Sequence, residues 1–106
     1  MCGIFGATGK NIKHVSQNYG REVLNHRGPD CFDTFISDDI YLAHNRLSII
    51  GLDEDSNQPL RGRNGLVIIC NGEIYNYKDL KQSVVADYSF KTHSDTEVIL
   101  ALYEKY

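Results

Sequence analysis

Cys2 offers the most specific chemistry in this sequence. Aminopeptidases remove an initiator methionine that precedes a small side chain, so we expect Cys2 to begin the mature chain. A cysteine in that place carries a nucleophilic thiolate and a free α-amine, whose reference pKa of about 7.7–8.0 makes it a base near pH 7. The same position also suits a small buried residue that starts a strand, because free cysteines are often buried. The other polar residues of the sequence indicate which of these two explanations of Cys2 is favoured.

Arg46 and Asp95 are charged residues that suit the head group of a ligand. An arginine binds a carboxylate in bidentate geometry, although near a strand end it is more often a solvated charge. An aspartate binds an ammonium group, but in the first turn of a helix it also stabilises the helix dipole. Each residue alone therefore has an ordinary structural explanation.

The segment Asn71-Gly72-Glu73 carries donors suited to a developing negative charge. An asparagine amide and a neighbouring backbone N–H are typical donors of an oxyanion hole. Asn-Gly between apolar segments is also the strongest short signal for a hairpin turn. Two further stretches, HRGPD at 26–30 and Gln58-Pro59, could also carry chemistry, although a helix-terminating turn and a loop turn are sufficient explanations. Taken together, the thiol, the donors and the two charged residues fit a ligand with an α-amino acid head and a carbonyl tail.

The elements that must position these residues follow from apolar periodicity and turn residues. In chain order we expect a strand at 2–8, a helix at 11–26 capped by Asn11, strands at 31–36 and 40–45 joined as a hairpin, a loop at 51–65, a buried strand at 66–70, a helix at 77–83, a short strand at 88–91 and a helix at 95–106. Ser94 and Glu97 match a capping box at the start of the last helix. That helix reaches the last residue without a stop signal, which favours a chain that holds part of a fold.

The composition describes one small globular domain of 106 residues. A formal net charge of −3 and the lack of a Lys/Arg cluster argue against a nucleic-acid partner. The sequence shows no membrane span and no secretory signal, so we expect a cytoplasmic protein. The three cysteines lack the spacing of a zinc site or a disulfide framework, so we expect no metal. A redox role is disfavoured because no resolving cysteine lies near Cys2 in the sequence.

Six stretches together resemble the class II glutamine amidotransferase domain, and most closely that of glutamine-hydrolysing asparagine synthetases. They are MCGIFG at the start, HRGPD, AHNRLSI around Arg46, Gln58-Pro59, NGEIYNY at 71–77 and SDTEVILALY at 94–103. The motifs occur in order and at compatible spacing over essentially the whole chain. Related glutaminases of glucosamine-phosphate and purine synthesis look different around HRGPD and Arg46.

The resemblance implies an α+β fold of the N-terminal nucleophile hydrolase type, an αββα sandwich that is incomplete in this chain. Residues 1–106 would be the N-terminal portion of a type 2 glutaminase domain, without the synthetase domain. The resemblance assigns Cys2 as nucleophile, Asn71 and Gly72 as oxyanion hole, Arg46 as the clamp of the glutamine carboxylate, Leu47, Ser48, Ile49 and Ile50 as the continuing binding stretch, and Glu73 and Asp95 as residues near the α-amino group.

The resemblance further implies hydrolysis of glutamine to glutamate and ammonia through a Cys2 thioester. In the family the ammonia serves ATP-dependent amidation of aspartate, so we expect no cofactor in this chain and ATP and Mg only in a synthetase domain. The expected partners are glutamine and a synthetase domain or the remainder of the glutaminase domain, with a homo-oligomer left open and neither nucleic acid nor membrane.

The family's glutaminase domain extends beyond the position of Tyr106, so we expect the isolated chain to have negligible glutaminase activity. The alternative is a truncated, non-catalytic remnant or interaction module that retains the motifs.

Overall fold

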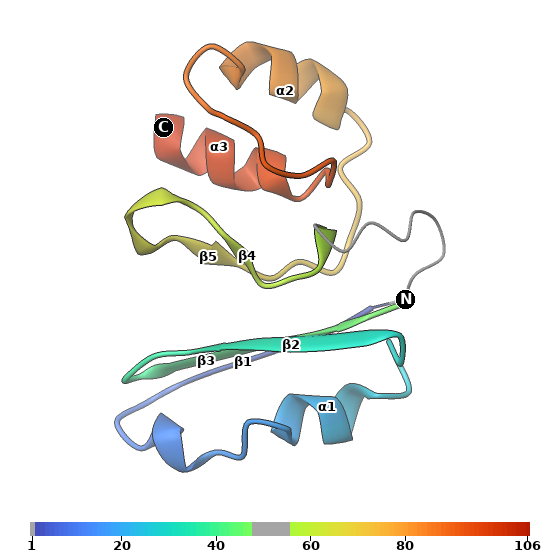
Figure 1. Cartoon of the computed structure of the whole chain (residues 1–106), viewed down its shortest axis with the longest axis vertical. Coiled ribbons are helices and arrows are strands. Elements are labelled where there is room, and N and C mark those ends of the chain that lie inside the picture. Colours follow the sequence, from blue (N-terminus) through green and yellow to red (C-terminus); the bar gives the residue numbers. More distant parts are fainter. Residues whose placement is uncertain (1, 48–55) are drawn as a thin grey trace.

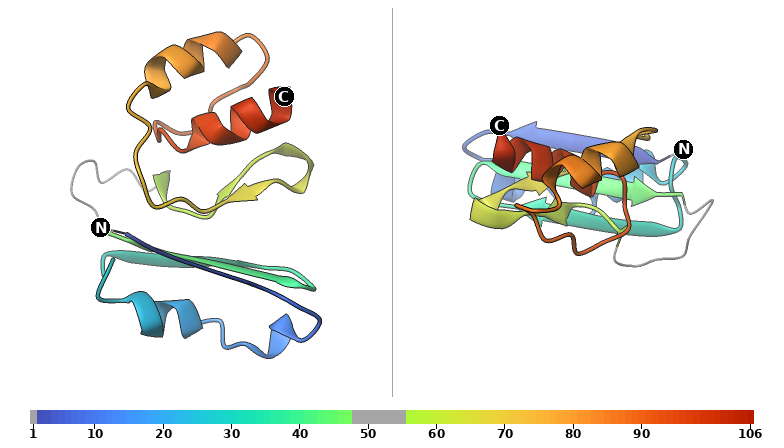
Figure 2. Two further views of the ribbon diagram at one scale, coloured as in Figure 1. Left: turned by 180° about the vertical axis from the view of Figure 1, so that it is seen from behind. Right: turned by 90° about the horizontal axis from the view of Figure 1, so that it is seen from above.

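The chain folds into two small antiparallel sheets with helices on both sides, as the computed structural model shows for residues 2–47 and 56–106 (Figure 1). Helix α1 (Tyr19–Leu24) covers one face of the three-stranded sheet. The two-stranded sheet lies on the other side, with α3 (Glu97–Lys105) and then α2 (Tyr77–Val84) beyond it (Figures 1 and 2). The mixed architecture agrees with the expected α+β class. None of the described helices is long and apolar enough to cross a membrane.

The three-stranded sheet has the order β1-β3-β2, with β3 in the centre. Its strands are β1 (Gly3–Thr8), β2 (Cys31–Ile36) and β3 (Ile40–Arg46). The predicted first strand and the predicted hairpin are therefore confirmed, because aromatic and β-branched residues line both arms around a polar turn. The register pairs the start of β1 with the end of β3, Gly3 opposite Asn45. The residue before β1 consequently lies beside the residue after β3.

The predicted helix at 11–26 is wrong in extent. The chain forms a short 3-10 helix, η1 (Ile12–His14), then extended backbone at Val15, and only later α1. Tyr41, fully buried in β3, explains the break. Its hydroxyl donates to the Gln17 carbonyl at 2.8 Å and accepts from the Gly20 N–H at 3.2 Å. The centre of the sheet therefore takes backbone groups that a continuous helix would use internally.

The two-stranded sheet pairs β4 (Leu60–Arg61) with β5 (Val67–Ile68). The predicted loop at 51–65 is wrong in its second part, because residues 60–65 hold β4 and the 3-10 turn η3 (Arg63–Gly65); residues 51–55 lie outside the described part. The predicted strand at 66–70 is shorter and only half-buried. Asn64 and Gly65 make the turn with φ of 55° and 75°, the left-handed conformations that Asn and Gly adopt most readily.

The predicted helix at 77–83 is confirmed as α2, whereas the predicted strand at 88–91 is absent from the described chain. The backbone where this strand was expected to end binds a side chain instead. Glu97, 3% exposed, accepts from the N–H groups of Lys91 at 2.8 Å and Thr92 at 2.7 Å. The predicted capping box is only half present: Ser94 Oγ accepts from the Thr96 N–H at 3.2 Å, but Glu97 does not reach back to Ser94. The last helix begins only at Glu97, and Thr96 precedes it without a side-chain cap bond. The Glu97 carboxylate is drawn to the preceding loop rather than to Ser94.

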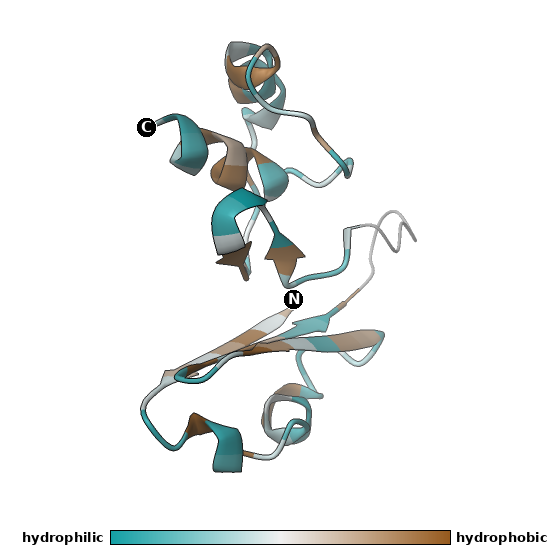
Figure 3. Ribbon diagram, turned by 60° about the vertical axis from the view of Figure 1, so that its left-hand side comes forward, coloured by the Kyte–Doolittle hydropathy of each residue, from teal (hydrophilic) through white to brown (hydrophobic). Residues whose placement is uncertain are grey.

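Two apolar clusters hold the layers together. One joins Ile12 to Tyr41 and Ala43 beneath the three-stranded sheet, and the other joins Val84 and Tyr88 to Ala101 between the last two helices. Figure 3 shows apolar residues along the strands and in α3. The Cys2 end of the molecule, where the N-terminus emerges, lies away from both clusters (Figures 1 and 2).

Candidate active site

The Cys2 thiol lies against the backbone of Leu47. Cys2 is half-buried and directly precedes β1. The Leu47 N–H donates to Cys2 Sγ at 3.4 Å, and Sγ lies 4.0 Å from the Leu47 carbonyl oxygen. The antiparallel register of β1 and β3 explains this contact, since Gly3 pairs with Asn45. The fold thus joins the predicted nucleophile to the predicted binding stretch, of which Ser48, Ile49 and Ile50 lie outside the described residues.

Arg46 is the last residue of β3 and is held from two sides. Its Nη1 donates to Asn57 Oδ1 at 2.6 Å, and its carbonyl accepts from the Asp30 N–H at 3.0 Å. Asp30 ends the HRGPD stretch, in which a Cβ on Gly28 would collide with the Asn45 carbonyl. HRGPD is thus the turn that was expected after the helix, and it packs onto the strand end that carries Arg46.

Asn71 and Gly72 follow β5 without forming a hairpin turn. Neither residue has a positive φ, and a Cβ built on Gly72 meets nothing within 4 Å. Within the described chain no hydrogen bond engages the Asn71 side chain or the Gly72 N–H. The hairpin explanation is therefore wrong for this pair. Two neighbouring donors remain available to a ligand, with Gly72 exposed and Asn71 half-buried. Glu73 is exposed beside them.

Asp95 lies before α3 rather than in its first turn. Its Oδ2 accepts from the Ile74 N–H at 2.6 Å. The carboxylate therefore fixes the chain just beyond Glu73, a role additional to any effect of its charge near the N-terminus of α3. Residues 69–76, the start of α3 and the N-terminus lie at the same end of the molecule in both views of Figure 2. The fold thus brings the termini of three separate elements toward the Cys2 end.

Three buried polar residues near this end belong to motifs that the sequence offered, but none of them was given a role of its own. Gln58, 8% exposed, was assigned only to a turn, yet it binds across to Cys70 and Thr96. His44 and Asn45 are 2% and 1% exposed, and their side chains lack a hydrogen-bond partner in the described chain. No local periodicity shows that these residues are buried, and the two partners of Gln58 lie far away in the sequence. The motif AHNRLSI, which contains two of them, is the signal that could have found them.

Burial lowers the pKa of His44. The Cys70 carbonyl lies close enough to oppose this shift without making a hydrogen bond, and the Arg46 charge lowers the pKa further. The ring is therefore neutral at pH 7 and adds no positive charge to the site.

Glu97 and Tyr88 form a second polar centre, behind the start of α3. Burial raises the pKa of Glu97, but hydrogen bonds from Lys91, Thr92 and Tyr88 outweigh it, so that the pKa falls below its usual range. The Tyr88 hydroxyl donates to Glu97 Oε1 at 3.2 Å. Burial and the Glu97 charge raise the pKa of Tyr88 to about 12. This centre stabilises the loop before α3 rather than offering a reactive group.

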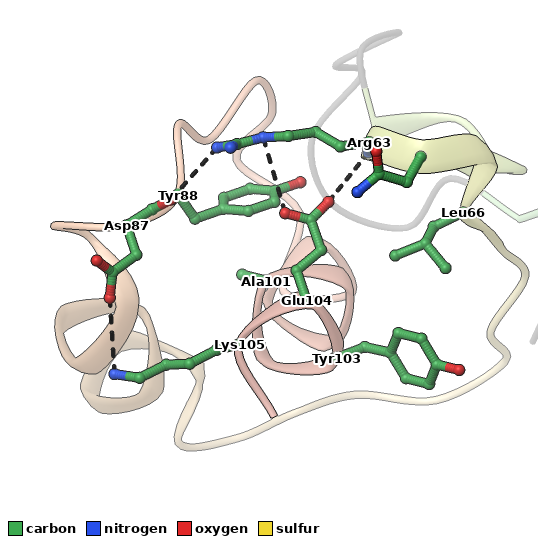
Figure 4. A pocket seen from close by; sticks show the side chains of 9 residues that line it. Arg63, Leu66, Asp87, Tyr88, Ala101, Tyr103, Glu104 and Lys105 are labelled. Atoms are coloured by element: carbon green, nitrogen blue, oxygen red, sulfur yellow. Dashed lines mark hydrogen bonds and ion pairs between the residues drawn. The ribbon is translucent and has the colours of Figure 1, made fainter.

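The hollow of about 480 Å³ in Figure 4 lies elsewhere, between the β4–β5 turn and the end of α3. Its charges are already paired: Arg63 Nε lies 3.7 Å from Glu104 Oε2, and Lys105 Nζ lies 3.8 Å from Asp87 Oδ2. None of the predicted site residues lines it. Among residues 2–47 and 56–106, no group of three His, Cys, Asp or Glu side chains could hold a metal ion.

Comparison with known proteins matches the whole chain, residues 1–106, to the glutamine amidotransferase domain family. A probable glutamine-hydrolyzing asparagine synthetase of Schizosaccharomyces pombe is 39% identical over 116 residues, covering 100% of this chain and 20% of the relative. One from Dictyostelium discoideum is 45% identical over 111 residues, covering 98% and 20%. Amidase chry2 of Gibberella zeae is 38% identical over 88 residues, covering 80% and 13%. The chain thus spans about 20% of the length of the synthetases it matches.

Proposed function

Because this chain belongs to the glutamine amidotransferase domain family, we propose that it is the glutamine-hydrolysing part of an asparagine synthetase-like amidotransferase. The observation that carries the proposal is the contact of Cys2 Sγ with Leu47, directly after Arg46. A thiol nucleophile and an arginine able to clamp a carboxylate are thereby brought to one strand end. A substrate whose carboxylate is bound by Arg46 would be held beside the Cys2 thiol, so that attack by the thiol becomes effectively unimolecular.

The proposed reaction begins when the free α-amine of Cys2, directly or through water, takes the thiol proton. The thiolate attacks the side-chain carbonyl carbon of glutamine, and the Asn71 amide and the Gly72 N–H donate to the oxyanion that forms. Each such donor contributes about 2.7–4 kcal/mol in other acyl-transfer sites. The C–N bond breaks, the nitrogen leaves as ammonia with the transferred proton, and a glutamyl thioester remains. Water then cleaves the C–S bond and releases glutamate.

Arg46 would bind the α-carboxylate of glutamine, and Glu73 and Asp95 would lie near its α-ammonium group. Leu47, Ser48, Ile49 and Ile50 would line the bound side chain. Asp95 already accepts one N–H from Ile74, but an ionised carboxylate has about four lone-pair sites. One carboxylate can therefore hold the protein backbone and a ligand ammonium at once.

The finer fold assignment is part of the proposal. Residues 1–106 would be the N-terminal portion of a glutaminase domain with the αββα sandwich of N-terminal nucleophile hydrolases. Two sheets with helices on both outer sides support this layering (Figure 1). The ammonia would serve amidation of aspartate in a synthetase domain, where ATP and Mg would bind. No residue of this chain is assigned to those cofactors.

The test measures glutamate release from glutamine by the complete product of the reading frame that contains this chain. We expect turnover that Cys2→Ala abolishes, and intact-mass spectrometry should show Met1 removed. A matched control is Cys31→Ala, which removes a half-buried thiol in β2. Turnover that survives in Cys2→Ala, or an active preparation that retains Met1, would contradict the mechanism. No turnover in the unmodified protein would favour the alternative, a non-catalytic module that retains the motifs.

A further inference from the structure

We propose that Gln58 is a positioning residue that holds Asn71 and Gly72 in place for catalysis. The inference rests on the proposed function, because it concerns the proposed oxyanion donors. It gives a role to Gln58, which the sequence placed in a motif, Gln58-Pro59, without an individual function.

The side chain of Gln58 bridges two segments that are distant in the sequence. Its Oε1 accepts from the Cys70 N–H, and its Nε2 donates to Thr96 Oγ1 at 3.5 Å. Both Gln58 and Thr96 are buried, with 8% and 3% of their surface exposed. Hydrogen bonds in such surroundings are costly to remove, since the remaining partner is left unsatisfied.

The bridge forms one of two anchors on either side of the donors. Cys70 immediately precedes Asn71, and its N–H is bound by Gln58. Ile74 follows Glu73, and its N–H is bound by Asp95 Oδ2 at 2.6 Å. Thr96 is the neighbour of Asp95, so the two anchors meet at the start of α3. The segment between the two anchors pairs with no strand in the described chain. The side chains of Gln58 and Asp95 therefore bind backbone N–H groups that a neighbouring strand would otherwise bind.

This arrangement matters for catalysis because oxyanion donors act only when they are already oriented. Misplacement by about 1 Å far from the chemistry can cost on the order of 100-fold in rate. Glutamine suits the bridge because one neutral side chain supplies both an acceptor and a donor. A glutamate would keep the acceptor but place a charge in a buried position.

The experiment compares Gln58→Met, which keeps the size but loses both hydrogen bonds, with Gln58→Glu, which keeps the acceptor. Tyr41→Phe is the matched control, since it also removes buried side-chain bonds to backbone, but on the α1 side. In the complete protein we expect Gln58→Met to lower kcat about 100-fold, with KM changed less than about threefold. Gln58→Glu should recover part of the loss, and Tyr41→Phe should leave kcat unchanged.

NMR order parameters of the Asn71 and Gly72 amides give a readout that is independent of activity. We expect them to fall from about 0.85 toward 0.6 in Gln58→Met and to stay constant in Tyr41→Phe. Unchanged order parameters, or a kcat equal to that of Tyr41→Phe, would overturn the positioning role. If the unmodified protein shows no Cys2-dependent turnover, the proposed function fails, and the order parameters still decide whether Gln58 holds the segment.

Discussion

Asn64-Gly65 and Asn71-Gly72 are the same dipeptide on either side of β5, yet the chain uses them in opposite ways. Asn64 and Gly65 adopt φ of 55° and 75° and turn the chain from β4 to β5. Asn71 and Gly72 have no positive φ and connect β5 to α2. The first pair makes a turn through its own backbone conformation. The second pair lies between Cys70 and Ile74, whose N–H groups are bound by side chains from distant segments.

The two glycines differ in whether the fold requires them, and this difference indicates which pair is available for catalysis. Gly65 has a φ of 75°, a conformation that is strained for residues that carry a Cβ atom, so the fold favours glycine at this position. The fold makes no such demand at Gly72, where a Cβ would meet open space and φ is ordinary. A glycine that packing and backbone geometry leave unexplained suits close approach of a ligand to the backbone. The comparison therefore separates a structural pair from a pair available for catalysis.

The largest expected effect is that of Asn71→Ala on turnover. Loss of one oxyanion donor should lower kcat of the complete protein about 100- to 1,000-fold. Asn64→Ala is the matched control and should leave kcat unchanged, because the β4–β5 turn carries none of the predicted site residues. Steady-state glutamate release measures both. Equal loss in the two variants would remove the distinction between the pairs.

A smaller effect is expected on stability from Gly65→Ala. Forcing a left-handed φ on alanine costs about 1–2 kcal/mol, so the free energy of unfolding should fall by about that amount in urea. The turnover per folded molecule should not change. An unaltered urea midpoint would mean that the turn relaxes freely, and Gly65 would then be no more structural than Gly72.

The smallest expected effect is a loss of stability in acid that comes from Glu97, whose side chain holds the loop before α3. Because the folded state lowers the pKa of Glu97, its contribution to stability is present above the unfolded pKa of about 4.3 and is lost as pH falls through the lower, folded value. Thermal unfolding from pH 6 to pH 3 should show this loss in the unmodified chain. Glu97→Gln should start less stable at pH 6 and depend less on pH. If the unfolding temperatures of the two proteins changed equally with pH, the Glu97 carboxylate would not be the source of the acid sensitivity.

The local parts of this fold were predictable, and the parts held by distant residues were not. The hairpin of β2 and β3 and the helix α2 follow from periodicity and turn residues alone. The helix expected at 11–26 fails because Tyr41 takes its backbone groups, and the capping box is incomplete because Glu97 binds Lys91 and Thr92 instead. In each case a side chain competes with a local rule, and that competition becomes visible only once the chain is folded.

The same reasoning applies to the candidate site. Its residue types were readable from the sequence because they follow a family motif. Their supports were not, since the Cys2–Leu47 contact depends on strand register and the Gln58 bridge joins residues 12 and 38 positions away along the chain. Whether Cys2, Arg46, Asn71 and Asp95 act together on glutamine stays a prediction for the experiments above.

The most direct test of the contrast between the pairs is Gly72→Ala, measured for both unfolding and turnover in the complete protein. The account predicts a free energy of unfolding within about 0.5 kcal/mol of the unmodified protein, together with a fall in Cys2-dependent glutamate release of at least about tenfold, equivalent to about 1.4 kcal/mol. A loss of stability like that of Gly65→Ala, with turnover per folded molecule unchanged, would contradict it.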